Sequence, residues 1–270
     1  MPRRAGAATG ATETMTPDDP GVGRLDPTAL AEEVHVWWAA TSALDDPALR
    51  QRCEGWLSAS ETERYRRYLR AEDRTLYLLA HALLRHTLAR YADLAPAEWS
   101  FAATEHGRPE PSGRCADFGL RFNLTHTPGL AACVIGDRVD AGIDVERAGR
   151  IERPLDLAAT SFAEGERRAL GALPAAALNQ RFLEIWTLRE AWLKARGTGF
   201  TLPRDRFALT VEGGGIGLEL SDPADGDPRD WQLQLWRPLE GYQGAVAVRR
   251  GPAADRRVVV RRGLAGGAPP

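Results

Sequence analysis

The chain has 270 residues, of which 43% are apolar and 27% charged, and its formal net charge is −2. This composition is typical of a soluble globular protein with one large domain or two smaller ones, and two is our expectation. It disfavours disordered, collagen-like and strongly nucleic-acid-binding proteins. No stretch approaches the roughly 20 apolar residues of a membrane-spanning helix, and no apolar signal-peptide core follows the N-terminal arginines, so we expect a cytoplasmic protein.

The cysteine and lysine counts are informative in different ways. Cys53, Cys115 and Cys133 lack CxxC spacing and cannot all pair with one another, so we interpret them as reduced core residues. Of the 35 basic residues, 34 are arginines, and Lys194 is the only lysine. A codon bias explains the arginines most simply. The single exception suggests a chemical role, because lysine can give up and recover a proton whereas arginine keeps its proton.

The first half of the chain begins with a tail. Residues 1–28, like residues 263–270, are rich in small and turn-forming residues without an apolar period, which predicts disorder. Residues 35–40 are typical of a strand. Ser60 and Glu63 match a capping box and predict a long, two-part helix that continues to about residue 92. Further strands are predicted at residues 99–103, 120–124, 130–135 and 141–146.

The second half repeats this order of elements. A helical block from about Glu164 to Ala195 precedes strands predicted at residues 207–211, 218–220, 231–236 and 244–248. The repeat is visible in letters as well, because Phe101-Ala-Ala-Thr with Gly107 matches Phe207-Ala-Leu-Thr with Gly213. Each match follows a long helix and a nearby proline.

From this repeat we predict an α+β fold of two pseudo-two-fold-related subdomains, residues 29–138 and 139–262. Each is expected to contain a long helix packed on a small, mainly antiparallel sheet. The active-site cleft is expected between the two subdomains.

Two carboxylates lie close together in the segment Gly-Ile-Asp-Val-Glu-Arg, residues 142–147. On a strand, Asp144 and Glu146 point to the same side, about 6.5–7 Å apart. Magnesium usually takes one or two protein carboxylates and completes its shell with water and phosphate oxygens. The pair is therefore sufficient for one Mg²⁺ ion if the substrate supplies a pyrophosphate. The same triplet also occurs on solvated strand faces that pair with arginines.

A second pattern lies on the later predicted helix. Trp186, Glu190 and Lys194 recur every four residues and form one row. An exposed Glu–Lys pair would give the same spacing. However, apolar residues spread over nearly the whole circumference of this helix, which indicates that it is covered on more than one side. A partly buried carboxylate and ammonium need each other, or a metal and a phosphate.

A third group of residues could bind an anion. Thr125, His126 and Thr127 end a predicted strand, and Arg108 lies on an earlier turn. Histidine and arginine on adjacent turns can bind a phosphate with a threonine hydroxyl as an additional donor, although a lone histidine is more often structural. The arginine-rich first helix, which includes Arg64, either extends this site or forms a solvated, salt-bridged face.

Together these segments resemble a known family. The segments G-I-D-V-E-R and W-T-L-R-E-A-W-L-K, with F-N-L-T-H-T and G-R-P upstream and G-T-G-F-T-L-P downstream, are similar to those of the large, monomeric 4′-phosphopantetheinyl transferases that activate surfactin synthetase and similar assembly lines. The resemblance spans roughly residues 55–250, in order and with compatible spacing.

The resemblance implies an enzyme of the holo-[acyl-carrier-protein] synthase type. Such an enzyme transfers the 4′-phosphopantetheine arm of coenzyme A to a serine of an apo acyl or peptidyl carrier protein and releases 3′,5′-ADP. Coenzyme A is the implied co-substrate, and Mg²⁺ the implied metal, with Mn²⁺ as an alternative. The implied partners include no nucleic acid and no membrane, and the implied state is a monomer.

The resemblance also implies roles for the matching residues. Glu190 would help to deprotonate the serine, and Lys194 would stabilise or protonate the departing 3′,5′-ADP. The implied metal ligands are Asp144, Glu146 and Glu190, and the implied ligands of the 3′-phosphate end of coenzyme A are Arg108 and His126. Beside these two we predict that Arg64, Thr125 and Thr127 also bind coenzyme A. One departure is Arg189, which stands where the family usually has lysine, so a proton-carrying role is in doubt at this position.

Two alternatives to this enzyme remain open. A Mg²⁺-dependent pyrophosphohydrolase acting on coenzyme A or a nucleotide would use the same groups but need no carrier protein. A non-catalytic module that binds carrier proteins would keep the fold and lose the chemistry. Nucleic-acid binding is the weakest alternative, because acidic residues balance the arginines.

Overall fold

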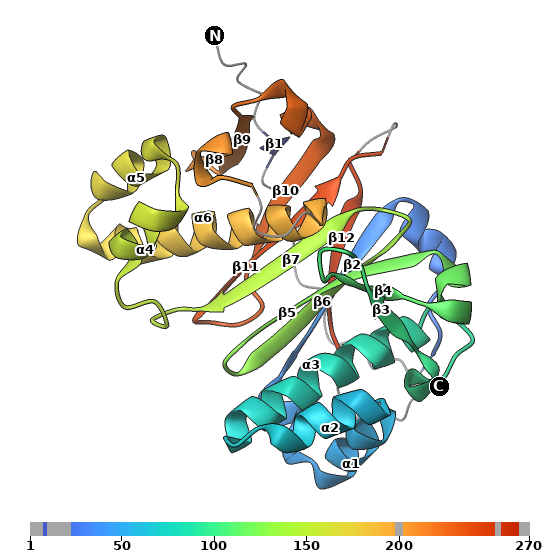
Figure 1. Ribbon diagram of the computed structural model, residues 1–270. Coiled ribbons are helices and arrows are strands. Elements are labelled where there is room, and N and C mark those ends of the chain that lie inside the picture. Colours follow the sequence, from blue (N-terminus) through green and yellow to red (C-terminus); the bar gives the residue numbers. More distant parts are fainter. Residues whose placement is uncertain (1–7, 10–22, 198–201, 252–254, 265–270) are drawn as a thin grey trace. The chain divides into compact units, whose positions relative to one another are not determined.

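The computed structural model describes residues 8–9, 23–197, 202–251 and 255–264. The described residues form two compact units, one within 14–139 and 256–270, the other within 1–13 and 140–255. We name them the α3 unit and the α6 unit after their longest helices (Figure 1). Each unit combines helices with mainly antiparallel sheet, which confirms the predicted α+β class.

The α3 unit contains a four-stranded sheet with the order β12-β2-β6-β5. β2 pairs antiparallel with β6, and β6 antiparallel with β5, whereas β12 pairs parallel with β2. The strands are β2 (Glu33–Ala40), β5 (Leu120–Thr127), β6 (Leu130–Asp137), β12 (Arg257–Arg262) and the separate hairpin strands β3 (Phe101–Ala103) and β4 (Pro109–Pro111). The helices are α1 (Pro47–Trp56), α2 (Ala59–Arg67) and α3 (Ala71–Ala89), with short 3-10 helices at Pro27–Ala31, Thr41–Asp45, Pro96–Glu98 and Gly113–Phe118.

Helix α3 packs on this sheet, and α1 and α2 lie against α3 (Figure 1). From Tyr77 to Ala89 nearly every residue of α3 is buried, including the polar Arg85 and His86. The core between helix and sheet includes Leu79, Leu83 and Ile135. A helix that is buried on most sides must satisfy its polar side chains inside the protein.

The α6 unit contains two three-stranded sheets, with the orders β10-β11-β7 and β1-β9-β8. All pairs in both sheets are antiparallel. The strands are β1 (Ala8–Thr9), β7 (Ala141–Arg147), β8 (Phe207–Glu212), β9 (Gly215–Leu220), β10 (Trp231–Trp236) and β11 (Tyr242–Arg249). The helices are α4 (Pro154–Ser161), α5 (Glu164–Gly171) and α6 (Ala175–Arg196), with 3-10 helices at Arg204–Arg206, Pro223–Asp225 and Pro228–Asp230.

The two units share an order of elements. In each, the first sheet strand is followed by a long helix, then a hairpin, then two more sheet strands, and the pairing of β2-β6-β5 matches that of β7-β11-β10. The hairpins β3–β4 and β8–β9 begin at Phe101 and Phe207, the residues that open the repeated letters. The sequence repeat therefore corresponds to one strand and helix plan used in both units.

Several predicted boundaries were wrong. The capping box is formed by Ser58 and Glu61, two residues before the predicted pair, because these residues bond each other's backbone N–H groups at the start of α2. Helix α1 was not predicted. The helical block from residue 164 to 195 is two helices, because the chain turns before Pro174, which precedes the first residue of α6.

The subdomain boundaries also differ in part from the prediction. The division at residues 139 and 140 lies next to the expected one, but β12, expected in the subdomain of residues 139–262, pairs with β2 in the α3 unit. Most of the two expected disordered tails, and residues 198–201 of the G-T-G-F-T-L-P segment, lie outside the described residues. Within the described helices, none combines the length and the apolar character needed to cross a membrane.

Candidate functional site

A close contact between α6 and β7 places the predicted acidic and basic residues. A Cβ atom at Gly142 would lie 2.1 Å from the Ala191 carbonyl oxygen and 2.4 Å from the Ala195 nitrogen, so the helix backbone lies directly on the strand at this glycine. Alternate residues of a strand share a face. Asp144 and Glu146 therefore lie on the same face as Gly142, toward α6.

Both strand carboxylates are buried and paired with cations. Lys194 Nζ donates to Asp144 Oδ1 at 2.7 Å and to the Ile143 carbonyl oxygen at 3.2 Å. Arg150 Nη1 donates to the two carboxylate oxygens of Glu146 at 2.9 and 2.8 Å. The only lysine of the chain is thus held against the first acid of the pair.

Glu190 lies one turn before Lys194 on the same helix and is partly buried. The pKa of Glu190 is raised to about 7, chiefly by burial and then by the nearby charge of Asp144, although Lys194 and Arg189 act in the opposite direction. A carboxyl group with a pKa near neutrality is suited to accept a proton from a hydroxyl group and to release it again.

The fit to a metal ion depends on these same groups. Among the described residues, no group of three or more His, Cys, Asp or Glu side chains is arranged to hold a metal ion. The chemical type of the side chains suits Mg²⁺, because Asp144, Glu146 and Glu190 all carry carboxylate oxygens. Their negative charges repel one another where water is largely excluded, and a cation would relieve this repulsion. The bonds that Lys194 and Arg150 make to these carboxylates would have to be exchanged in part for bonds to the cation.

The predicted anion-binding residues lie in the α3 unit. Arg108 follows the turn between β3 and β4, and its Nη2 atom donates to the Phe122 carbonyl oxygen on β5 at 3.4 Å. The structure therefore brings Arg108 to the strand that carries Thr125, His126 and Thr127. On this strand His126 is exposed, whereas both threonines are buried.

Arg64 lies on a different element, the exposed side of α2. Its guanidinium carbon is 5.7 Å from the centre of the Tyr77 ring. With Ser60, Glu63, Arg67 and Tyr68 it lines an open hollow of about 430 Å³. Arg67 pairs with Glu63 in this hollow, so the role of Arg64 in anion binding stays a prediction.

Two features of the site were missed from the sequence. Arg150, which pairs with Glu146, stands four residues after it, but this spacing carries no meaning in the turn that follows a strand. Arg189, which precedes Glu190, points away from the acidic pair and makes a buried ion pair with Glu166 of α5. That partner is 23 residues away, so only the tertiary structure reveals it.

The fold and this site define a class of protein: an α+β protein in which buried carboxylates and one ammonium group from a strand and a helix meet. Such a group can hold a hard cation, accept a proton and neutralise charge on a phosphate leaving group. This is the chemistry of phosphoryl-type transfer at a pyrophosphate.

Comparison with known proteins identifies the family. A family model described as the 4′-phosphopantetheinyl transferase superfamily matches residues 140–247. The chain is 22% identical to a solved holo-(acyl-carrier-protein) synthase from Bacillus anthracis, over 41% of this chain and 96% of that one, with a TM-score of 0.34. It is 27% identical to the 4′-phosphopantetheinyl transferase Sfp of Bacillus subtilis over 64% of this chain and 75% of Sfp. It is 33% identical to the 4′-phosphopantetheinyl transferase HetI of Nostoc sp. over 68% of this chain and 77% of HetI. The chain therefore belongs to the 4′-phosphopantetheinyl transferase superfamily.

Proposed function

We propose that this chain transfers the 4′-phosphopantetheine arm of coenzyme A to a serine hydroxyl of an apo carrier protein and releases 3′,5′-ADP. The observation that carries the proposal is the contact of Lys194 with Asp144, one turn from Glu190, in a member of this superfamily. The serine oxygen forms a bond to the β-phosphorus of coenzyme A while the bond from that phosphorus to the bridging oxygen breaks.

The side chains of the α6 unit supply the groups that this reaction needs. Glu190, a partly buried carboxylate one turn from Lys194, accepts the proton of the attacking hydroxyl. The Lys194 ammonium stabilises or protonates the phosphate of the departing 3′,5′-ADP. Asp144, Glu146 and Glu190 would hold Mg²⁺, or Mn²⁺ in its place, and a bound cation would neutralise charge on the pyrophosphate.

Coenzyme A binding is assigned to residues of the α3 unit. Arg108 and His126 are proposed to bind the 3′-phosphate, and Arg64 to add to the attraction for anions. The exposure of His126 supports a direct contact, whereas the burial of Thr125 and Thr127 favours a supporting role at the end of β5. We also propose, from the shared order of elements, that the two units are related by a pseudo-two-fold axis and that the active-site cleft lies between them.

The finer points of the proposal concern subtype and partners. We propose holo-[acyl-carrier-protein] synthase activity on acyl or peptidyl carrier proteins, by a monomer in the cytoplasm that acts without nucleic acid or membrane. Sfp and HetI are named as 4′-phosphopantetheinyl transferases without a carrier class, so the carrier must be found by assay.

The test is incubation of the protein with coenzyme A, Mg²⁺ and a panel of apo carrier domains, followed by intact-protein mass spectrometry. We expect one carrier class to gain the mass of a phosphopantetheine arm, and its serine-to-alanine variant to gain nothing. Free phosphopantetheine without a carrier would instead identify the pyrophosphohydrolase. Carrier binding without any mass gain would identify the non-catalytic module.

A further inference from the structure

Arg189 is enclosed on the side of α6 away from the acidic pair. Only 4% of it is exposed, and its guanidinium group lies over the rings of Phe207 and Phe162, 3.9 and 5.2 Å from their centres. Its Nη1 atom donates to the Glu166 carboxylate oxygens at 3.0 and 2.7 Å and to the Phe207 carbonyl oxygen at 3.4 Å. Its Nη2 atom donates to the Arg204 carbonyl oxygen at 3.2 Å. One side chain thus satisfies four acceptors.

Glu166 connects further elements to this arginine. It is the third residue of α5, and its Oε2 atom accepts from the Ala163 N–H at the start of that helix at 2.7 Å. Its Oε1 atom accepts from the Leu209 N–H on β8 at 2.8 Å. The pair of Arg189 and Glu166 therefore joins α6 to α5 and to the hairpin strand β8. We call this pair the α6 clamp.

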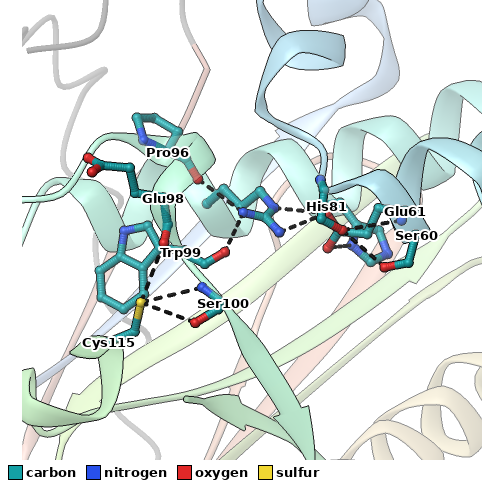
Figure 2. Close-up of polar contacts among 10 residues, drawn as sticks. Ser60, Glu61, His81, Pro96, Glu98, Trp99, Ser100 and Cys115 are labelled. Carbon is teal, nitrogen blue, oxygen red and sulfur yellow. Dashed lines mark hydrogen bonds and ion pairs between the residues drawn. The ribbon is translucent and has the colours of Figure 1, made fainter. Parts of the chain in front are cut away.

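The α3 unit contains a matching pair of residues. Arg85 is 2% exposed, and its Nε and Nη2 atoms lie 3.0 and 2.8 Å from Glu61 Oε2. Its Nη1 atom donates to the carbonyl oxygens of Pro96 and Trp99 at 3.1 and 2.7 Å, and its guanidinium group lies 5.2 Å from the centre of the Phe101 ring. Figure 2 shows the polar contacts around Glu61, Pro96 and Trp99.

The two pairs share the same main partners. Each arginine lies on the long helix, and each glutamate is the third residue of the preceding short helix, where it accepts from the N–H at the helix start. Each arginine binds two carbonyl oxygens before or at the start of the hairpin, and each lies over the phenylalanine that opens it, Phe101 or Phe207. Arg189 therefore occupies the same structural position in the α6 unit as Arg85 occupies in the α3 unit.

We propose that Arg189 is a positioning residue for the proposed phosphopantetheinyl transfer, acting through the α6 clamp. The clamp holds one side of α6 on α5 and β8, while Gly142 lets the other side lie on β7. These two contacts set the rotation of the helix, so that Glu190 and Lys194 face Asp144 and Glu146. The inference rests on the proposed function, because only that function gives the orientation of Glu190 a chemical consequence.

The structure also explains why arginine suits this position. Four acceptors on three elements surround the guanidinium group, and a planar group with five donors can reach them together. A lysine ammonium is a point charge with three donors, so it would keep the ion pair with Glu166 but lose the carbonyl contacts. The ammonium also lacks the flat face with which the guanidinium group covers the Phe207 ring.

The test compares Arg189→Lys and Glu166→Gln with Leu218→Ala, a core truncation in β9 of the same unit that serves as a control for lost stability. A misplacement of about 1 Å at a catalytic group can lower a rate by about 100-fold. We expect both clamp variants to lower kcat by roughly 10- to 100-fold with little change in the KM for coenzyme A. Leu218→Ala is expected to lower Tm about as much as the clamp variants do and to leave kcat unchanged.

A second readout does not need the reaction. Because Lys194 is the only lysine, labelling with ¹⁵N-lysine gives one side-chain ammonium signal, which reports directly on its contact with Asp144. We expect this signal to shift in Glu166→Gln and to stay in place in Leu218→Ala. If the Lys194 signal shifts in Glu166→Gln but the parent protein modifies no carrier, the positioning role of the α6 clamp stands and the proposed function is rejected. An unmoved signal, or equal kcat losses in clamp and control variants, would overturn the positioning role.

Discussion

Lys194 lies beside two carboxyl groups of different character. Asp144 accepts its hydrogen bond at 2.7 Å, whereas Glu190, one turn earlier, has a pKa raised to about 7 by burial and by the charge of Asp144. The ammonium group therefore compensates one acid and lies close to a second that can exchange a proton. An arginine at this position would keep the charge but hold its proton more tightly and spread its donors over a wider plane.

Lys194→Arg is expected to bind coenzyme A nearly normally and to transfer slowly, with the defect in kcat. Lys194→Ala should cost about 2–4 kcal/mol of transition-state stabilisation, comparable to the loss of one preorganised donor, with a smaller change in KM. Steady-state kinetics at saturating carrier protein measures both effects. Full activity of Lys194→Arg would mean that another group stabilises the departing 3′,5′-ADP.

Asp144→Asn and Glu146→Gln keep the size of each side chain and remove its charge. We expect either change to abolish Mg²⁺-dependent transfer and to leave the circular dichroism spectrum unchanged, because the lost group is a proposed metal ligand. Activity measured against Mg²⁺ concentration is the check. Near wild-type turnover at limiting Mg²⁺ would contradict the metal assignment. Ca²⁺ is expected to replace Mg²⁺ poorly, since its longer bonds and looser geometry misplace the pyrophosphate.

His86 of α3 makes the stability of its unit depend on pH. Its ring stacks on Trp56 at 5.5 Å, burial lowers its pKa to about 4, and the charge of Arg90 acts in the same direction. The unfolded chain takes up the proton near pH 6.5, before the folded protein does. The stability that depends on neutral His86 is therefore fully present above about pH 6.5 and is lost as the pH falls toward 4.

We expect His86→Phe to remove roughly 2–4 kcal/mol of this pH dependence between about pH 6.5 and 4. Denaturant unfolding at several pH values measures the difference between variant and parent. The exposed His106→Gln variant is the matched control and should follow the parent curve. Parallel curves for His86→Phe and the parent would show that His86 does not account for the loss.

At the scale of elements, the contact of α6 with β7 depends on one missing side chain. Gly142→Ala would place a methyl group 2.1 Å from the Ala191 carbonyl oxygen, which belongs to the helix backbone and cannot rotate away. Overpacking of this kind typically costs about 1–3 kcal/mol. We expect lower Tm and, because α6 must move away from β7, a larger loss of kcat than of coenzyme A affinity. Gly165→Ala, where a Cβ meets nothing within 4 Å, is the control.

The positions of the site residues within their own strand or helix could be predicted from the sequence, whereas their partners on other elements could not. A period of two on β7 and of four on α6 placed Asp144, Glu146, Glu190 and Lys194 correctly within their own elements, because local geometry decides these positions. The long-range partners could not be predicted. The pairing of Arg189 with Glu166 depends on how α5, α6 and β8 pack, and no spacing within one element encodes it.

At the scale of the whole molecule, the fold class and the repeat were predictable, and the closing strand was not. Val258, Val259 and Val260 are typical of a strand, but β12 pairs with β2, whose residues stand more than 200 positions earlier. A pairing over this distance leaves no local signal. The predicted assignment of residues 139–262 to one subdomain was wrong at this strand for the same reason.

Removing β12 is expected to weaken only the α3 unit. A chain that stops after Asp255 loses the three buried valines, each worth roughly 1.5–3 kcal/mol, and leaves the backbone of β2 unpaired on one edge. Hydrogen exchange should become faster in β2 and stay slow in β11. A chain that stops after Leu264 keeps β12 and should match the parent. Unchanged exchange in β2 after the shorter truncation would contradict this role of β12.

The pairing of β12 with β2 has a consequence for the order in which the protein matures during translation. Residues 140–255, which supply both three-stranded sheets except for β1, are synthesised before residues 257–262. Domains usually fold in the order of their synthesis. Here the α3 unit is started first and completed last, and throughout that interval the edge of β2 is open to other nascent chains.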